Sequence, residues 1–194
     1  MTYILYLAAG NARRFGSNKL LAMLNGKPVF LYGLERLMAL KECRTDCTVT
    51  VVSRTPEILT AATALGAYTV ESPQSEKGIS YTIRAGLASI EPLQLTDSVM
   101  FVLADQPWLT ADSMNKLLDA AQTGCFAATA AYGETDGSPT LFSAQCLPAF
   151  QKLEGDQGGR RILKQHPEKV VRVQLQNPQE LWDVDQPEDL EIHT

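Results

Sequence analysis

Thr2-Tyr-Ile-Leu-Tyr-Leu7 is a short apolar strand that runs directly into Ala8-Ala-Gly-Asn-Ala-Arg-Arg-Phe-Gly-Ser-Asn-Lys19, a basic loop containing two glycines. Small residues followed by cationic ones bring backbone N–H groups and positive charge together, a combination that suits a polyphosphate. The loop is not a P-loop, because five residues separate Gly10 from Gly16 and Lys19 follows three residues later. The dinucleotide fingerprint G-x-G-x-x-G is also absent. A ligand-binding loop is predicted, with a plain β–α turn as the alternative.

Segments with strand and helix patterns alternate along the rest of the chain. The pattern fits strands at 48–52, 67–70, 98–104 and 125–131. It also fits one helix that begins at Pro28 and three further helices over 56–65, 79–90 and 111–122. After about residue 132 we expect a Gly/Pro turn at 137–139, a strand at 140–142, two short helices, a strand at 170–175 and a final helix after Pro187. This order predicts a three-layer α/β fold, a mostly parallel open sheet with helices on both faces, in one domain spanning 1–194.

The composition limits the class of protein. The 194 residues are 45% hydrophobic and 20% charged, which is ordinary for a globular domain. No apolar run reaches the roughly 18 residues that span a bilayer, and no leader pattern precedes the first strand, so we expect a cytoplasmic protein without a membrane partner. A net charge of −5 argues against nucleic-acid binding. The four cysteines form no C-x-x-C pair, which makes zinc improbable and predicts reduced thiols.

Two acidic stretches follow apolar segments. Asp105 follows the strand at 98–104, where a partly dry carboxylate is costly unless it binds a cation or caps a helix, and Thr110 is a better N-cap for the next helix. Asp183 and Asp185 alternate, so they point the same way in an extended segment. Mg²⁺ prefers carboxylates together with substrate phosphates and water. Asp105 with either of the later aspartates is a candidate Mg²⁺ site, and helix capping is the alternative for Asp185.

The ligand crevice of an open α/β sheet lies beyond the carboxyl ends of its strands. The loops at 8–19, 71–78 and 105–107 should therefore share one rim. Two later loops, Gly137-Ser-Pro-Thr-Leu-Phe142 and Gly155-Asp-Gln-Gly-Gly-Arg-Arg-Ile-Leu163, are either ordinary turns or contacts for a second substrate. The second loop has three glycines, one acid and two arginines in seven residues, which suits a polar, anionic molecule.

Six motifs in a fixed order resemble the nucleotidyltransferases that attach a nucleotide to the molybdenum cofactor. They are Leu7-Ala-Ala-Gly10 with Arg14, Gly16 and Lys19; Gly78-Ile-Ser-Tyr-Thr-Ile-Arg-Ala-Gly86; Ala104-Asp-Gln-Pro107; Gly137-Ser-Pro139 with Leu141-Phe142; Gly155-Asp-Gln-Gly-Gly-Arg160; and Asp183-Val-Asp-Gln-Pro-Glu-Asp-Leu190. The resemblance covers almost the whole chain and implies a Rossmann-like nucleotidyltransferase fold. The cytidylyl branch is the more similar, because guanylyl-transferring relatives usually read Leu-Ala-Gly-Gly at the first motif.

The resemblance also implies roles for individual residues. The implied nucleotide-binding residues are Leu7, Ala8, Ala9, Gly10, Arg14, Lys19, Gly78 and Ser80. Lys19 and Arg14 would bind the triphosphate and, with Asp105, act in catalysis. Asp105 and Asp185 would hold Mg²⁺, the implied cofactor. The implied acceptor-binding residues are Gly137, Ser138, Pro139, Asp156 and Arg160.

The implied reaction is Mg²⁺-dependent transfer of CMP from CTP to the terminal phosphate of molybdopterin, with release of diphosphate. Guanylyl transfer from GTP is an alternative. A second alternative is transfer to another phosphorylated acceptor, because Ser138 stands where the family more often has Asn, His or Arg. Two further alternatives are a nicotinamide-dependent pigment reductase of related sequence and a non-catalytic protein that delivers cofactor to a recipient molybdoenzyme. The joint presence of Lys19, Asp105 and Asp185 favours catalysis.

Overall fold

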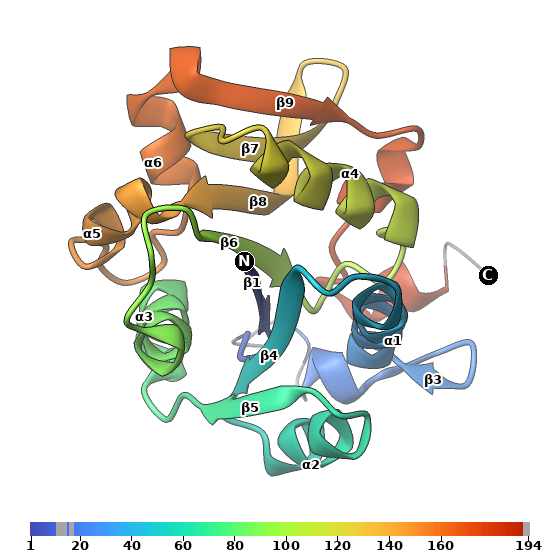
Figure 1. The fold of residues 1–194 in the computed structure, drawn as a ribbon. Coiled ribbons are helices and arrows are strands. Elements are labelled where there is room, and N and C mark those ends of the chain that lie inside the picture. The colour runs from blue at the N-terminus through green and yellow to red at the C-terminus, as the bar shows by residue number, and fades with distance from the viewer. Residues whose placement is uncertain (11–14, 16–17, 192–194) are drawn as a thin grey trace.

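The computed structural model of the chain describes residues 1–10, 15 and 18–191. Within these residues, a seven-stranded sheet has the order β5-β4-β1-β6-β8-β7-β9, which runs from the bottom to the top of Figure 1. The strands are β1 (Thr2–Leu7), β4 (Cys47–Ser53), β5 (Tyr68–Glu71), β6 (Ser98–Leu103), β7 (Ala127–Tyr132), β8 (Thr135–Ser143) and β9 (Val170–Gln174). A separate hairpin joins β2 (Met23–Leu24) to β3 (Lys27–Pro28).

The sheet is mostly parallel, as predicted. Strand β1 pairs in parallel with both β4 and β6, and β5 continues in parallel beside β4. Strand β8 is antiparallel to both of its neighbours, β6 and β7, while β9 is parallel to β7. The three-layer α/β prediction is therefore confirmed, and the antiparallel strand is confined to the half of the sheet built after residue 132.

Helices cover both faces of the sheet (Figure 1). One face carries α1 (Val29–Cys43), α2 (Pro56–Ala64) and α4 (Ala111–Gln122), and the other carries α3 (Ile79–Ile90), α5 (Leu147–Phe150) and α6 (Arg160–Gln165). Short 3₁₀ turns lie at Lys19–Leu21, Ser75–Lys77, Ala144–Cys146, Pro167–Lys169, Pro178–Leu181 and Pro187–Leu190. Among the helices of the described residues, none is both long and apolar enough to cross a membrane.

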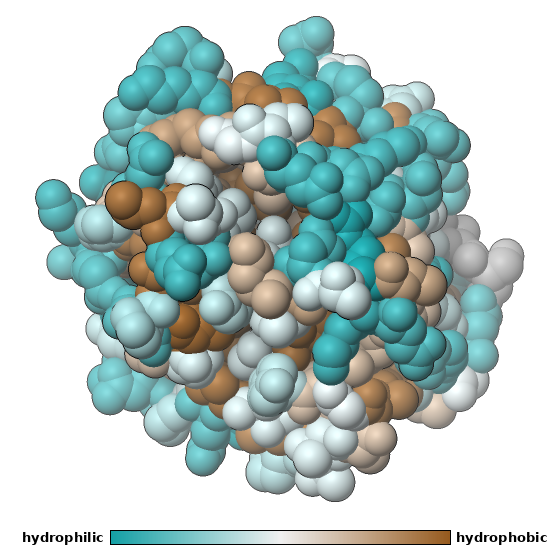
Figure 2. Space-filling model, viewed as in Figure 1, coloured by the Kyte–Doolittle hydropathy of each residue, from teal (hydrophilic) through white to brown (hydrophobic). Residues whose placement is uncertain are grey.

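Each strand divides its side chains between two cores. In β1, Ile4 and Tyr6 pack in the core under α1, α2 and α4, whereas Leu5 and Leu7 pack under α3, α5 and α6. This division follows from the two-residue period of a strand. On the side of the molecule shown in Figure 2, hydrophobic residues reach the surface only in small, separate areas.

Two local predictions were wrong. The residues 137–139 do not form a turn, because β8 continues through them as an irregular stretch without partners on β7, and the chain reverses instead at Gly133, which adopts a φ of +55°. The Gly137 carbonyl accepts a hydrogen bond from the Thr129 hydroxyl at 2.8 Å, beside a shift of register between β7 and β8. The segment after Pro187 is a single 3₁₀ turn rather than a helix.

Candidate active site

A cavity of about 450 Å³ opens at the carboxyl ends of β1 and β6. It is lined by Leu7, Ala9 and Gly10 after β1, by Lys19 and Leu20, by residues 75–79 with Thr82, by Leu103 and Asp105 after β6, and by Asp156 and Asp185. The described parts of the three loops that were expected to share a rim therefore do share it. Six of the lining side chains are charged, namely Lys19, Glu76, Lys77, Asp105, Asp156 and Asp185.

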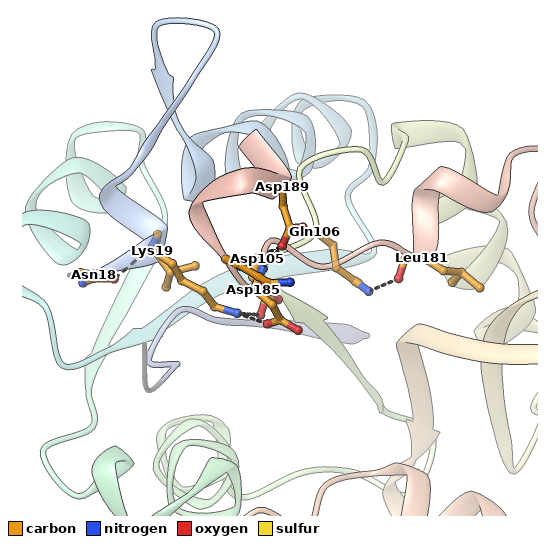
Figure 3. A network of polar contacts seen from close by, with 9 residues as sticks. Asn18, Lys19, Asp105, Gln106, Leu181, Asp185 and Asp189 are labelled. Carbon is orange, nitrogen blue, oxygen red and sulfur yellow. Dashed lines mark hydrogen bonds and ion pairs between the residues drawn. The ribbon is translucent and has the colours of Figure 1, made fainter. Parts of the chain in front are cut away.

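Lys19 is the centre of the charged network (Figure 3). Its Nζ lies 2.8 Å from Oδ2 of Asp105 and 2.9 Å from Oδ1 of Asp185. The Lys19 side chain is only 9% exposed. Burial by itself would lower the pKa of the Lys19 ammonium, but the charge and hydrogen bond of Asp105, reinforced by Asp185, outweigh burial and raise that pKa. The ammonium is therefore held in its charged form between two carboxylates.

Local structure aims Lys19 into the cavity. Asn18 caps the 3₁₀ turn at Lys19–Leu21, because its Oδ1 accepts the N–H of Leu20 at 3.2 Å. The Asn18 amide also donates to the Thr55 hydroxyl at 3.0 Å, which ties the turn to the start of α2. Leu20 packs in the core under α1 and also borders the cavity, while its neighbour Lys19 extends toward the two carboxylates.

The C-terminal segment, residues 182–186, brings the second carboxylate to the site. Its Val184 N–H donates to the backbone carbonyl of Asp105 at 2.8 Å, and the Val184 side chain is fully buried against Leu24 and Val29. The carboxylate of Asp189 accepts the N–H groups of both Asp185 and Gln186. Asp185 thus points its side chain at Lys19 rather than capping the following turn, and Thr110 caps α4 by accepting the N–H of Ser113.

Asp183 is a third carboxylate beside this pair. The pKa of the Asp183 carboxyl is raised to about 6, first because neighbouring protein atoms take away part of its hydration and second because Asp105 is negatively charged. The Asp183 side chain nevertheless keeps contact with solvent. The neighbouring charge of Asp185 acts in the same direction, and Lys19 opposes it. This clustering of carboxylates makes the end of the cavity strongly attractive to a cation.

The donor set fits a hard divalent cation. Oδ1 of Asp105 is buried and has no hydrogen-bond partner among the described residues, and the other oxygen already accepts a cationic group. No group of three or more His, Cys, Asp and Glu side chains in the described ranges is arranged to hold a metal ion. Two carboxylates with the remaining positions left to water and phosphate is the pattern that Mg²⁺ favours.

The residues implied as nucleotide-binding do not all face the cavity. Leu7, Ala9 and Gly10 line it. The side chain of Ala8 packs in the opposite core, and its carbonyl accepts the Ser53 hydroxyl at 2.7 Å. Ser80 is fully buried, with its hydroxyl unpartnered among the described residues, and does not line the cavity. Arg14 lies outside the described residues.

Two hydroxyl residues at the cavity were not identified from the sequence. Thr82 is one helical turn beyond Gly78 at the start of α3, and Ser75 lies in the 3₁₀ turn just before it. Both are almost completely buried, and the Ser75 hydroxyl has no partner in the described part of the chain. The helical i, i+4 period from Gly78 would have identified Thr82.

Gly78 joins the cavity to the loop at 155–156. A Cβ on Gly78 would lie 2.2 Å from the Gly155 carbonyl carbon, and its φ of +125° belongs to the region that glycine tolerates. The Gly155 carbonyl also accepts the N–H of Ser80 at 3.0 Å. As a result, Asp156 lines the same cavity as the implied nucleotide-binding residues.

The other implied acceptor residues do not line this cavity. Gly137, Ser138 and Pro139 belong to β8, and Gly137 contacts Leu181 so closely that an added Cβ would lie 2.4 Å from Cδ2 of that side chain. Arg160 begins α6 and donates to the Asp136 carbonyl at 3.3 Å.

A comparison with protein families matches residues 4–170 to the MobA-like NTP transferase domain. The chain belongs to this family of nucleotidyltransferases. The purine catabolism protein PucB of Bacillus subtilis (strain 168) is 31% identical over 199 residues, which cover 96% of this chain and 93% of that protein.

Solved structures of similar proteins share the fold of this MobA-like NTP transferase. Rv0371c of Mycobacterium tuberculosis H37Rv is 20% identical with a TM-score of 0.78, over 98% of this chain and 95% of that one. Molybdopterin-guanine dinucleotide biosynthesis protein A of Archaeoglobus fulgidus is 17% identical with a TM-score of 0.70, over 98% and 95% of the two chains. At these identities the likeness establishes the fold alone.

The family match covers only part of the charged network of this MobA-like NTP transferase. The matched range contains Lys19 and Asp105 but ends before Asp185. The C-terminal segment that carries Asp185 depends on Val184, whose backbone and side chain attach it to the β6 loop and the β2–β3 hairpin.

Proposed function

We propose that this chain is a molybdenum cofactor cytidylyltransferase, which transfers CMP from CTP to the terminal phosphate of molybdopterin and releases diphosphate. The observation that carries the proposal is the meeting of Lys19 with Asp105 and Asp185 at one cavity of about 450 Å³. Members of this family handle nucleoside triphosphates, and the cavity combines a cationic group with a pair of carboxylates able to hold a divalent cation.

In this proposal the nucleotide occupies the cavity. The backbone of Leu7, Ala9 and Gly10 borders the base and ribose, and Gly78 lines the same region, where Ser75 and Thr82 add hydroxyl groups. Ala8 and Ser80 support the walls from behind. Arg14 completes the triphosphate-binding group together with Lys19.

The proposed cofactor is Mg²⁺, held by Asp105 and Asp185. When bound, the cation would neutralise negative charge that gathers on the phosphates during transfer. The partner-free Oδ1 of Asp105 supports this assignment, as does the chemistry of two carboxylates beside a triphosphate site. The protein Rv0371c, which shares the fold, has also been solved as a complex with manganese.

The reaction requires no strong general base. The terminal phosphate of the acceptor is already ionised at neutral pH, so one of its oxygens attacks the α-phosphorus of CTP directly. The new P–O bond forms as the bond from the α-phosphorus to the bridging oxygen breaks, and the electron pair leaves with diphosphate. Since two polyanions must approach each other, Lys19 contributes mainly by supplying positive charge at the reacting phosphates.

Two features bear on the base and the acceptor. Ala9 is 7% exposed and lines the cavity, and in this proposal its methyl group leaves less room for a purine than a glycine would. Molybdopterin as acceptor is supported by the name of the Archaeoglobus fulgidus protein, which also makes GTP the competing donor. Asp156, Gly137, Ser138, Pro139 and Arg160 are the proposed acceptor-binding residues; of these, Asp156 lines the cavity itself.

A ligand panel tests the proposal. Thermal unfolding is measured with CTP, GTP, ATP, UTP and NADPH, each with and without Mg²⁺, because a ligand at 100 times its Kd stabilises a protein by about 2.7 kcal/mol. We expect the largest stabilisation with CTP and Mg²⁺, followed by diphosphate release when molybdopterin is added. A response to GTP alone would replace CMP by GMP transfer, and a metal-independent response to NADPH would contradict nucleotidyl transfer.

A further inference from the structure

The ammonium of Lys19 occupies the position where a cation would sit between Asp105 and Asp185. It contacts one oxygen of each carboxylate, at 2.8 and 2.9 Å, and Figure 3 shows the Lys19 side chain reaching across to both. Two cations cannot share these oxygens closely without strong repulsion. A metal ion that takes Oδ2 of Asp105 and Oδ1 of Asp185 must therefore displace the Lys19 ammonium, and one bound through the partner-free Oδ1 of Asp105 would still be repelled by it.

We propose that Lys19 closes the metal site in the nucleotide-free chain, so that the metal binds strongly only when the phosphates of a nucleotide draw the ammonium away. The inference rests on the proposed function, since it assigns to a nucleoside triphosphate the role of opening the site. It gives Lys19 a part in the binding of metal and nucleotide, in addition to its charge in the reaction.

The surroundings of Lys19 explain why the nucleotide is needed. The side chain is 9% exposed, so an ammonium removed from its carboxylates keeps little contact with water. Leaving a buried charge unpaired is costly. Of the other acidic residues that line the cavity, Glu76 pairs with Arg54, and Asp156 projects from the separate loop beside Gly78. A phosphate group supplies the missing anionic partner.

Thermodynamic linkage gives this arrangement a measurable consequence. If nucleotide raises metal affinity by some factor, metal raises nucleotide affinity by the same factor. A triphosphate also chelates metal in solution, so the joint measurement cannot identify the contribution of Lys19. The decisive quantity is the affinity for metal in the absence of nucleotide.

The experiment measures Mn²⁺ binding without nucleotide, from the electron paramagnetic resonance signal of free Mn²⁺. Wild-type chain is compared with Lys19→Met, which removes the ammonium but keeps the length of the side chain. Lys77→Met is the matched control, because Lys77 lines the same cavity and its Nζ lies 5.7 Å from the centre of the Tyr81 ring. We expect Lys19→Met to bind Mn²⁺ at least about tenfold more tightly than wild type. Lys77→Met should change the affinity much less.

Thermal unfolding supplies a second readout. In EDTA, Lys19→Met should unfold at a lower temperature than wild type, because Asp105 and Asp185 then lack their shared cation. Mn²⁺ alone should restore more stability to this variant than to wild type. Lys19→Gln repeats the test with a polar side chain, should the methionine variant fail to fold. Equal or weaker Mn²⁺ binding by the folded variants would overturn the proposal.

Failure of the proposed transferase function and failure of the closed metal site give different results. Tight Mn²⁺ binding by wild type alone, unimproved in Lys19→Met, would overturn the closed metal site while CTP-dependent diphosphate release by wild type remained. Tighter Mn²⁺ binding by Lys19→Met, with no diphosphate release by wild type from any nucleotide, would leave the closed site intact and contradict the transferase.

Discussion

At the scale of single residues, the candidate site depends on where one strand ends and where one 3₁₀ turn begins. Asp105 is the second residue beyond β6, and Lys19 is the first residue of a 3₁₀ turn capped by Asn18. Each of these two residues is positioned by the element next to it in the sequence. Their ion pair at 2.8 Å then links residues that are 86 positions apart in the sequence.

Replacing Asp105 by Asn tests the metal role. The substitution keeps the backbone carbonyl that accepts the Val184 N–H but removes the charge that attracts a cation. We expect metal-dependent turnover to fall at least about 100-fold. The chain should still fold, but with a lower thermal unfolding midpoint, because the buried Lys19 ammonium then pairs with the charge of Asp185 alone. Asp112→Asn is the matched control, since Asp112 is paired with Lys116 on α4, away from the cavity lining. Near-normal turnover of the Asp105 variant would exclude this carboxylate as a metal ligand.

Replacing Gly78 by Ala tests the contact between loops. The new methyl group would collide with the Gly155 carbonyl, and the φ of +125° adds backbone strain. The free energy of unfolding should fall by more than about 1 kcal/mol, measured by urea denaturation. Gly124→Ala provides the comparison, because Gly124 has a φ of +71° but no atom within 4 Å of an added Cβ. If the two variants lose equal stability, the collision at Gly155 contributes nothing.

At the scale of elements, the site is assembled by segments that contribute little regular structure of their own. The C-terminal segment at 182–186 has neither helix nor strand, yet Val184 fastens it to the loop after β6. The ring of Trp182 packs edge-on against Trp108, with centroids 6.3 Å apart, beside the same attachment. This packing sets the position of Asp185.

Shortening Val184 to Ala should weaken that attachment. Loss of two buried methyl groups is expected to cost about 1–2 kcal/mol of unfolding free energy. Because Asp185 would be less well positioned, Mn²⁺ affinity in the presence of nucleotide should also fall by about 10-fold or more. Val171→Ala, at a 42% exposed position on β9, should change neither quantity appreciably. Loss of stability with unchanged Mn²⁺ affinity would show that Val184 does not position Asp185.

At the scale of the whole molecule, the candidate active site and a stabilising network of ion pairs lie at opposite ends of the sheet. The cavity lies at the carboxyl ends of β1 and β6, while Arg44 and Asp46 precede β4 at the opposite end. Arg44 contacts Asp46 at 2.7 Å and Asp119 of α4 at 2.6 Å. The hydrogen bond from Arg44 is the main reason that the pKa of the Asp46 carboxyl lies well below its usual range.

This network predicts a stability that depends on pH. An unfolded Asp has a pKa of about 3.9, and the folded Asp46 has a lower one, so the network stabilises the fold above about pH 4 and loses this effect as the pH falls further. The difference in unfolding temperature between wild type and Arg44→Met should therefore be largest near pH 7 and shrink toward pH 3. Arg54→Met, which breaks an exposed 3.4 Å pair with Glu76, should show a smaller difference. A constant difference across this range would contradict the assignment to Asp46.

Much of the fold was predictable because local patterns and tertiary packing agree. The segments at 79–90 and 111–122 are helices with the predicted bounds, and the strand at 98–104 differs by one residue. Prediction failed where the sequence signal was turn-like but the neighbours imposed a strand. At 137–139, glycine and proline indicated a turn. Instead these residues form an irregular stretch within β8, where the register with β7 shifts between the paired residues Asp136 and Thr140 and the Gly137 carbonyl accepts the Thr129 hydroxyl.

The sequence by itself determined the alternation of strands and helices, and it identified Lys19, in the loop after the first strand, and Asp105, just beyond a later strand, as candidate functional residues. These features are local, because they depend on periodicity and on polar residues next to apolar runs. The sequence also offered Asp183 or Asp185 as the partner of Asp105, and only the tertiary structure decided that Asp185 contacts Lys19, that Ala8 faces away, and that Ser75 and Thr82 line the cavity. These outcomes depend on contacts between distant segments, such as Val184 with the β6 loop, and no local pattern encodes such contacts.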